Sequence, residues 1–70
     1  MNLVAGYRKM LGMTQNEMAE KLGISKQSYY KKENKKVSFT DQEKILFKNM
    51  LVPLFPSITI DDIFFSKKVS

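Results

Sequence analysis

Apolar residues recur at helical spacing along most of the chain, and no segment alternates as a half-buried strand would. A first helix is predicted over 3–11, after Asn2, which is an acceptable N-cap. Gly12 follows as a natural C-terminal stop. The apolar residues that give this helix its spacing are Leu3, Val4, Tyr7, Met10 and Leu11.

Two further helices are predicted next, and the first of them opens with a capping box. In Thr14-Gln15-Asn16-Glu17 the hydroxyl and the carboxylate satisfy amide donors that the helix leaves free. This helix runs to about Leu22, and Gly23 supplies the positive φ that lets the chain leave it sharply. Ser25 caps a third helix, predicted over 25–33.

The rest of the chain predicts a loop and two helices. Residues 34–38 are polar and lack periodicity, which indicates a loop. Thr40-Asp41-Gln42-Glu43 is a second capping box, and its helix ends before Pro53 because a residue that precedes proline avoids the α region. Thr59, three residues before Asp62, is a weaker cap of the same kind and begins a short fifth helix. The apolar residues that the fourth helix offers to the core are Ile45, Leu46, Phe47, Met50 and Leu51.

The length of the chain limits its organisation. Seventy residues lie near the lower bound at which one apolar core holds a fold, so no second domain fits. We therefore expect an all-α, compact five-helix fold, with a single domain over 1–66 and a short basic tail at 67–70.

Composition excludes several kinds of chemistry. The chain has no cysteine and no histidine, which removes disulfides, thiolate zinc sites and Cys or His nucleophiles. We expect no enzyme, no metal and no cofactor. Gly6, Tyr7 and Arg8 interrupt the segment where a secretory peptide needs an apolar run, and no later run reaches membrane-spanning length. A cytoplasmic protein is expected.

Positive charge is concentrated in one segment. Residues 21–36 hold six lysines and one acid, so they alone account for the formal net charge of +5. A local excess of this kind is typical of a surface that binds a polyanion, although a lysine-rich solvated helix face has the same composition. The lysines are Lys21, Lys26, Lys31, Lys32, Lys35 and Lys36, and the acid is Glu33.

Two short helices joined by a glycine turn, with the small residue Ala19 where they cross, form a helix-turn-helix. Its residues resemble the Cro-type helix-turn-helix family of phage repressors and bacterial regulators. The resemblance covers about residues 3–65, including the closing "ITIDDIF". It is carried by Leu11-Gly12-Met13-Thr14, Gln15, Ala19, Gly23, Ile24 and Glu33-Asn34.

The resemblance implies a repressor-like DNA-binding domain whose third helix enters the major groove while the second crosses the DNA backbone. It assigns base reading to Lys26, Gln27 and Lys31. Gln27 is the most discriminating of these, because a carboxamide pairs bidentately with adenine. The residues that it places at the DNA backbone are Gln15, Ser28, Tyr30, Asn34, Lys35 and Lys36. For Ser28 and Tyr30 a thymine methyl group is the alternative contact to phosphate.

Three residues depart from the family pattern. Tyr29 occupies the position of an aliphatic core residue and fits there if its hydroxyl finds a partner; alternatively Tyr30 turns inward. Lys32 replaces an apolar residue, and we expect its stem to lie on apolar surface while its ammonium reaches solvent. Lys35 replaces a glycine, which predicts a different path for the loop.

The C-terminal third holds more large apolar residues than so small a domain can bury. We expect an exposed patch made by Leu54, Phe55, Phe64 and Phe65. It would serve a homodimer or another protein partner. A dimer would place two recognition helices one DNA turn apart on a near-palindromic operator.

Two functional hypotheses follow. The first is a sequence-specific regulator that occupies an operator in double-stranded DNA, as part of a phage-type genetic switch in a bacterial host cell. The alternative is a modulator, or antirepressor, that binds a cognate repressor protein and alters its DNA binding. The lysine segment suits an acidic protein partner as well as phosphate.

Overall fold

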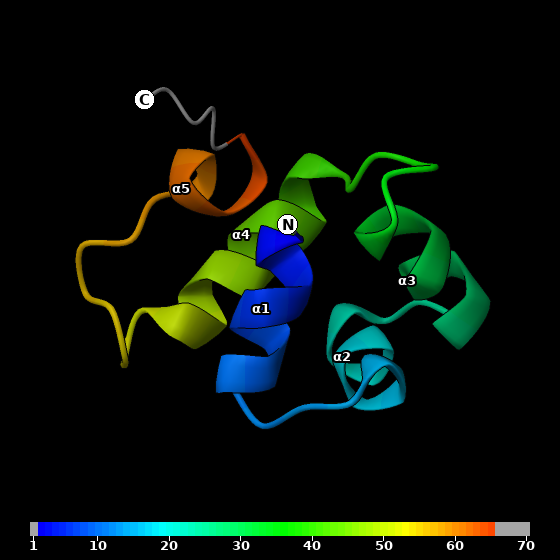
Figure 1. Cartoon of the computed structure of the whole chain (residues 1–70), viewed down its shortest axis with the longest axis horizontal. Helices are drawn as coiled ribbons and strands as arrows, with labels where there is room; N and C mark the ends of the chain where they lie inside the picture. The colour runs from blue at the N-terminus through cyan, green and yellow to red at the C-terminus, as the bar shows by residue number, and fades with distance from the viewer. Residues whose placement is uncertain (1, 66–70) are drawn as a thin grey trace.

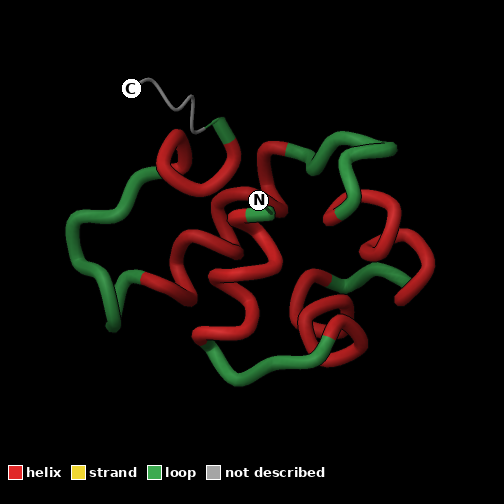
Figure 2. Tube along the Cα trace, viewed as in Figure 1, coloured by secondary structure: helices red, strands yellow, loops and turns green. Residues whose placement is uncertain are grey.

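The computed structural model describes residues 2–65, and this part of the chain contains five α-helices and no strand (Figures 1 and 2). The predicted all-α, five-helix fold is thereby confirmed. The basic tail predicted at 67–70 lies outside the described residues. The helices are α1 (Leu3–Met10), α2 (Gln15–Leu22), α3 (Lys26–Glu33), α4 (Asp41–Leu51) and α5 (Ile60–Phe64).

Side-chain caps start the helices where the sequence predicts them. Thr14 Oγ1 accepts from the Glu17 amide at 3.1 Å, and the Glu17 carboxylate accepts from the Thr14 amide at 2.9 Å. The same reciprocal box opens α4 and α5, while Asn2 and Ser25 cap α1 and α3 with one side-chain bond each. Each helix start is therefore set by local sequence.

The helices enclose one core. α2 packs against α3 and α4, and α5 packs against α1 and α4. In Figure 1, α3 lies at one end of the long axis and the connection between α4 and α5 lies at the other. The buried apolar residues are Val4, Met18, Ala19, Leu22, Tyr29, Phe39, Phe47, Leu51, Ile58 and Ile63.

Phe39 anchors the connection between α3 and α4 to this core. Its ring meets Tyr29 at 6.0 Å and Phe47 at 6.4 Å between centroids, both edge to face. Phe64 of α5 lies 5.1 Å from the same ring. The polar loop predicted at 34–38 is thus held by the first apolar residue after it.

Three apolar residues expected inside are exposed. On α4, Phe47 and Leu51 stand four residues apart and face the core, whereas Ile45 and Leu46 project to solvent with 48% and 40% of their surface exposed. A helix that covers a core on one side buries a single stripe, so consecutive apolar residues cannot all face inward. Met10, at the end of α1, is also largely exposed.

The end of α3 is a Schellman motif with lysine at the position that usually holds glycine. The Lys36 amide donates to the Lys31 carbonyl at 2.8 Å, and the Lys35 amide donates to the Lys32 carbonyl at 3.1 Å. Lys35 has φ +65°, in the left-handed region. The predicted change of path at Lys35 is wrong, because the two hydrogen bonds keep the left-handed conformation without a glycine.

Lys35→Gly should stabilise the protein by about 0.5 to 1 kcal/mol, because a left-handed residue with a Cβ costs about 1 to 2 kcal/mol and glycine's extra freedom in the unfolded chain returns part of that gain. Lys36→Gly is the matched control, since it removes the same charge one residue later and outside positive φ; it should destabilise by about 0.4 to 1 kcal/mol. Urea unfolding measures both changes. Equal losses in the two variants would contradict the strained cap.

Candidate nucleic-acid interface

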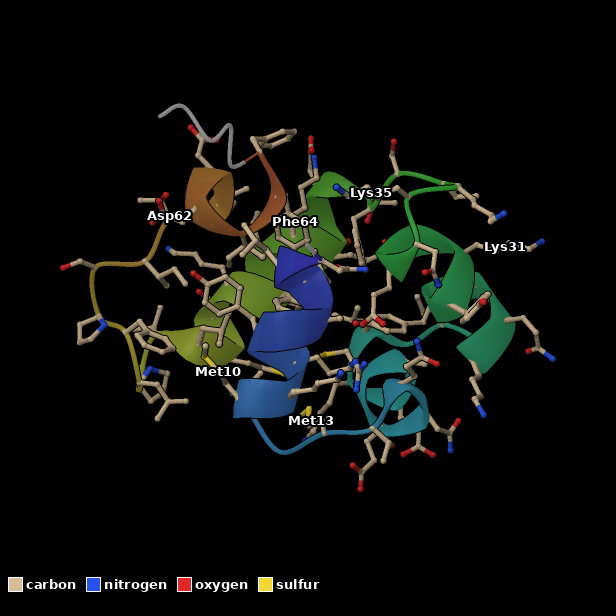
Figure 3. The ribbon with its side chains drawn as sticks, in the orientation of Figure 1. Met10, Met13, Lys31, Lys35, Asp62 and Phe64 are labelled. Atoms are coloured by element: carbon tan, nitrogen blue, oxygen red, sulfur yellow. The ribbon has the colours of Figure 1, made fainter. Side chains whose placement is uncertain are left out.

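The roll of α3 is defined by two buried side chains. Tyr29 and Glu33 stand four residues apart and face the core with 0% and 3% of their surface exposed. Lys26, Gln27 and Lys31 lie on the other side and are exposed. Figure 3 shows Lys31 pointing away from the body of the molecule. Tyr29 therefore fills the core position, and the alternative in which Tyr30 turns inward is wrong.

Five of the candidate residues come together on this outward surface. They line one shallow pocket, which is walled mainly by carbon atoms. The group joins the three residues assigned to base reading with two assigned to the DNA backbone. Its members are Lys26, Gln27, Tyr30, Lys31 and Lys36.

Three other backbone candidates do not line this pocket. Asn34 Nδ2 donates to the Tyr30 carbonyl at 2.9 Å, so the amide helps to end α3. Ser28 is half-buried on the flank of the helix. Lys35 lines a second pocket with Phe64 and Lys44, and Figure 3 shows Lys35 and Phe64 in the same region, away from Lys31.

The carboxylate of Glu33 is the centre of a buried hydrogen-bond network. Arg8 of α1 donates to it from Nε at 2.8 Å and from Nη2 at 3.3 Å, and the Tyr29 hydroxyl donates at 2.5 Å. Gln15, the first residue of α2, donates from Nε2 at 2.8 Å. The amide expected at a DNA phosphate therefore also holds α2 to α3, with one N–H left for an outside acceptor.

These donors determine the charge state of the network. Burial by itself would raise the pKa of Glu33, but the hydrogen bonds from Arg8, Tyr29 and Gln15 outweigh burial and hold that pKa below its ordinary value. Burial, and then the bond to Glu33, raises the pKa of the Tyr29 hydroxyl. The hydroxyl stays protonated and donates, while the carboxylate stays ionised and accepts.

A second ion pair fixes α3 to α4. Lys32 Nζ lies 2.7 Å and 2.9 Å from the two carboxylate oxygens of Glu43, and both side chains are about nine-tenths buried. Burial would raise the pKa of Glu43, but the Lys32 ammonium and the amide of Thr40 hold it below its ordinary value. The expectation that the Lys32 ammonium reaches solvent is wrong, because this carboxylate binds it.

The two ion pairs bind two of the charged side chains of the basic segment, residues 21–36. Glu33 is neutralised by Arg8, and Lys32 is neutralised by Glu43. The segment then presents five exposed lysines and no unpaired acid, so its surface remains strongly positive. These lysines are Lys21, Lys26, Lys31, Lys35 and Lys36.

The four residues expected to form one apolar patch lie in two groups. Leu54 and Phe55 line a pocket that the connection after α4 forms with Tyr7 of α1 and Asp62 of α5. Phe64 and Phe65 line the pocket that includes Lys35 and Lys44. The ring of Phe64 packs on Phe39 and Phe47 and is only partly exposed, because it completes the aromatic core.

The network around Glu33 was not predicted from the sequence, although one signal was present. Arg8 is the sole arginine of the chain, and Glu33 is the sole acid among the residues of the basic segment. Its partner is 25 residues away in the sequence, so helical spacing cannot identify it.

Comparison with known families agrees with this arrangement. A family model described as "Helix-turn-helix" matches residues 4–43, which is more than half of the chain. The chain belongs to this helix-turn-helix family, of the Cro/C1 type, and membership indicates a DNA-binding transcription regulator. No curated protein and no solved structure matches the chain.

Two further properties of the described structure concern membrane-spanning helices and metal-binding groups. Among residues 2–65, no helix is both long and apolar enough to cross a membrane. Nor do three His, Cys, Asp or Glu side chains in that range come together as a metal site requires.

The Glu33 network predicts a specific acid sensitivity. Because the folded-state pKa of Glu33 lies below the ordinary value of 4.5, the stability that it contributes is complete above about pH 4.5 and is lost as the pH falls through the folded-state pKa. Glu33→Gln should flatten this acid dependence of the free energy of unfolding and lower the value at pH 7 by about 3 to 5 kcal/mol.

Denaturant unfolding between pH 2 and 7 measures both effects. Glu20→Gln, at an exposed position on α2, is the control and should unfold like the wild type at pH 7. An equally steep acid dependence in wild type and Glu33→Gln would contradict the assignment.

Proposed function

We propose that the protein is a sequence-specific transcription regulator that occupies an operator in double-stranded DNA through α3. The observation that carries the proposal is the outward surface of α3, where Lys26, Gln27 and Lys31 line one pocket, while Glu33, the one acid of residues 21–36, is bound inside to Arg8. Membership of the helix-turn-helix family supports the same conclusion.

The mechanism follows from the chemistry of these side chains. α3 lies in the major groove, where the carboxamide of Gln27 pairs with an adenine edge. Lys26 and Lys31 reach guanine acceptors or phosphates, and Lys36 binds the backbone beyond the helix. Gln15 directs its free N–H to a phosphate, helped by the amides and the dipole at the start of α2. Ser28, Asn34 and Lys35 complete the proposed backbone contacts.

Occupancy of the site is the proposed regulatory act. In a phage-type genetic switch in the cytoplasm of a bacterial host cell, a bound domain of this size excludes polymerase or a competing repressor from overlapping DNA. Leu54 and Phe55 support a homodimer, because they are exposed in the connection between α4 and α5. Figure 1 shows this connection at the end of the molecule opposite α3, so a contact there leaves both recognition helices free.

Binding to a cognate repressor is the second candidate function. The exposed rings of Phe55 and Phe65, in two separate pockets, favour it because large exposed apolar side chains mark protein contacts. Size-exclusion chromatography with a candidate cognate repressor tests it. A complex at micromolar concentration supports this function, and separate elution contradicts it.

A salt series tests DNA binding directly. A labelled duplex selected from a random pool should lose affinity steeply with salt, with a log-log slope of about −0.9 for each phosphate contacted. Lys36→Ala should weaken all sequences alike and reduce the slope by about 0.9. Gln27→Ala should keep the slope and lose about 1 to 3 kcal/mol of discrimination at one base pair.

Lys48→Ala is the control for net charge, since it removes one lysine from the end of α4 that lies away from α3 (Figure 1). It should bind like the wild type. A flat salt response in the wild type would contradict DNA binding, and a uniform loss in Gln27→Ala would remove that residue from base reading.

A further inference from the structure

The outward surface of α3 carries one aromatic ring among its lysines. Tyr30 is 51% exposed, in a helix whose other exposed residues are polar or charged. The core does not need this ring, because Tyr29 fills the inward position and bonds to Glu33. Packing of the fold therefore does not explain why an aromatic ring stands half-exposed on the outward surface of α3.

The neighbours of Tyr30 define what it can bind. The ring stands four residues after Lys26 and three after Gln27, so helical geometry sets it beside both. All three line the pocket on α3, together with Lys31 and Lys36. The walls are mainly carbon, which the ring and the methylene stems of the lysines supply. A surface that only bound phosphate would have no use for an apolar centre.

The major groove offers one kind of apolar group to such a centre. Among the base edges exposed there, only thymine carries a methyl group, and apolar side chains recognise it by contact. Phosphates and sugars lie at the rim of the groove, where Lys36 suits them, whereas Tyr30 lies next to the side chain best suited to adenine.

We propose that Tyr30 is a specificity-determining residue whose ring contacts the 5-methyl group of a thymine beside the base pair read by Gln27. The inference rests on the proposed DNA-binding function and deepens it. Of the two contacts that the family resemblance leaves open for Tyr30, phosphate or a thymine methyl, it selects the methyl group and adds Tyr30 to the base-reading set. The operator then contains an A·T pair for Gln27 and a neighbouring thymine for Tyr30.

Replacement of thymine by deoxyuridine isolates the methyl group, because base pairing and the O4 acceptor are unchanged. In a duplex selected by the wild type, each thymine is replaced in turn and the dissociation constant is measured. One replacement, next to the base pair that Gln27→Ala affects, should weaken binding about fourfold. This factor corresponds to losing the burial of one methyl-sized group, about 0.8 kcal/mol.

Two variants assign the effect to the ring. Tyr30→Ala should bind the thymine and deoxyuridine duplexes equally, and Tyr30→Phe should retain the fourfold difference because it keeps the ring and loses only the hydroxyl. Both changes lie on an exposed face, and thermal unfolding checks that the variants are folded.

The outcomes separate the two levels of the proposal. If deoxyuridine has no effect at any position, or if Tyr30→Ala keeps the difference, the role of Tyr30 is overturned while DNA binding stands. If the wild type selects no duplex at all, the proposed function itself fails and this inference fails with it.

Discussion

The buried carboxylate of Glu33 is the interaction on which the arrangement of this domain depends. It accepts hydrogen bonds from Arg8 of α1, from Gln15 of α2 and from Tyr29 of α3 itself. A carboxylate removed from water is costly unless its oxygens are satisfied, so these donors are required together. One charged group thus fixes the start of α2 and the roll of α3 relative to α1. The shared acceptor thereby holds the helix-turn-helix, whose turn is made at Gly23, against α1.

The two buried ion pairs separate the charges that hold the fold from the charges that face solvent. Glu33 and Lys32, which the sequence shows as members of the basic segment, are both bound inside, to Arg8 and to Glu43. The lysines left over project from the end of α2, from the outward face of α3 and from the turn after it. The domain therefore presents a positive surface that no acid of the same segment weakens. This division makes a chain of modest net charge well suited to a polyanion.

Local sequence predicted the helices because their signals are local. Capping boxes at Thr14, Thr40 and Thr59 each need only four consecutive residues, and all three form as predicted. The faces of the helices were harder to predict. Ile45 and Leu46 are as apolar as Phe47, and only the packed position of α4 decides which of them is buried.

The candidate site was predictable in its members and not in its geometry. The family pattern names Gln27 and Lys31, but adjacent tyrosines leave the roll of α3 undecided, since either ring could face the core. The decision comes from the hydrogen bond between Tyr29 and Glu33 and from the contact of Tyr29 with Phe39. Both depend on tertiary structure. Whether the outward residues contact DNA stays a prediction.

Thiol labelling of single-cysteine variants tests the central claim most directly, because the chain has no cysteine of its own. Gln27→Cys and Lys31→Cys should react rapidly in the free protein and become protected when a selected duplex is bound. Asp61→Cys, on α5, should react at the same rate with and without DNA. Slow labelling of Gln27→Cys in the free protein, or labelling of both α3 variants that DNA does not slow, would contradict an outward-facing recognition helix.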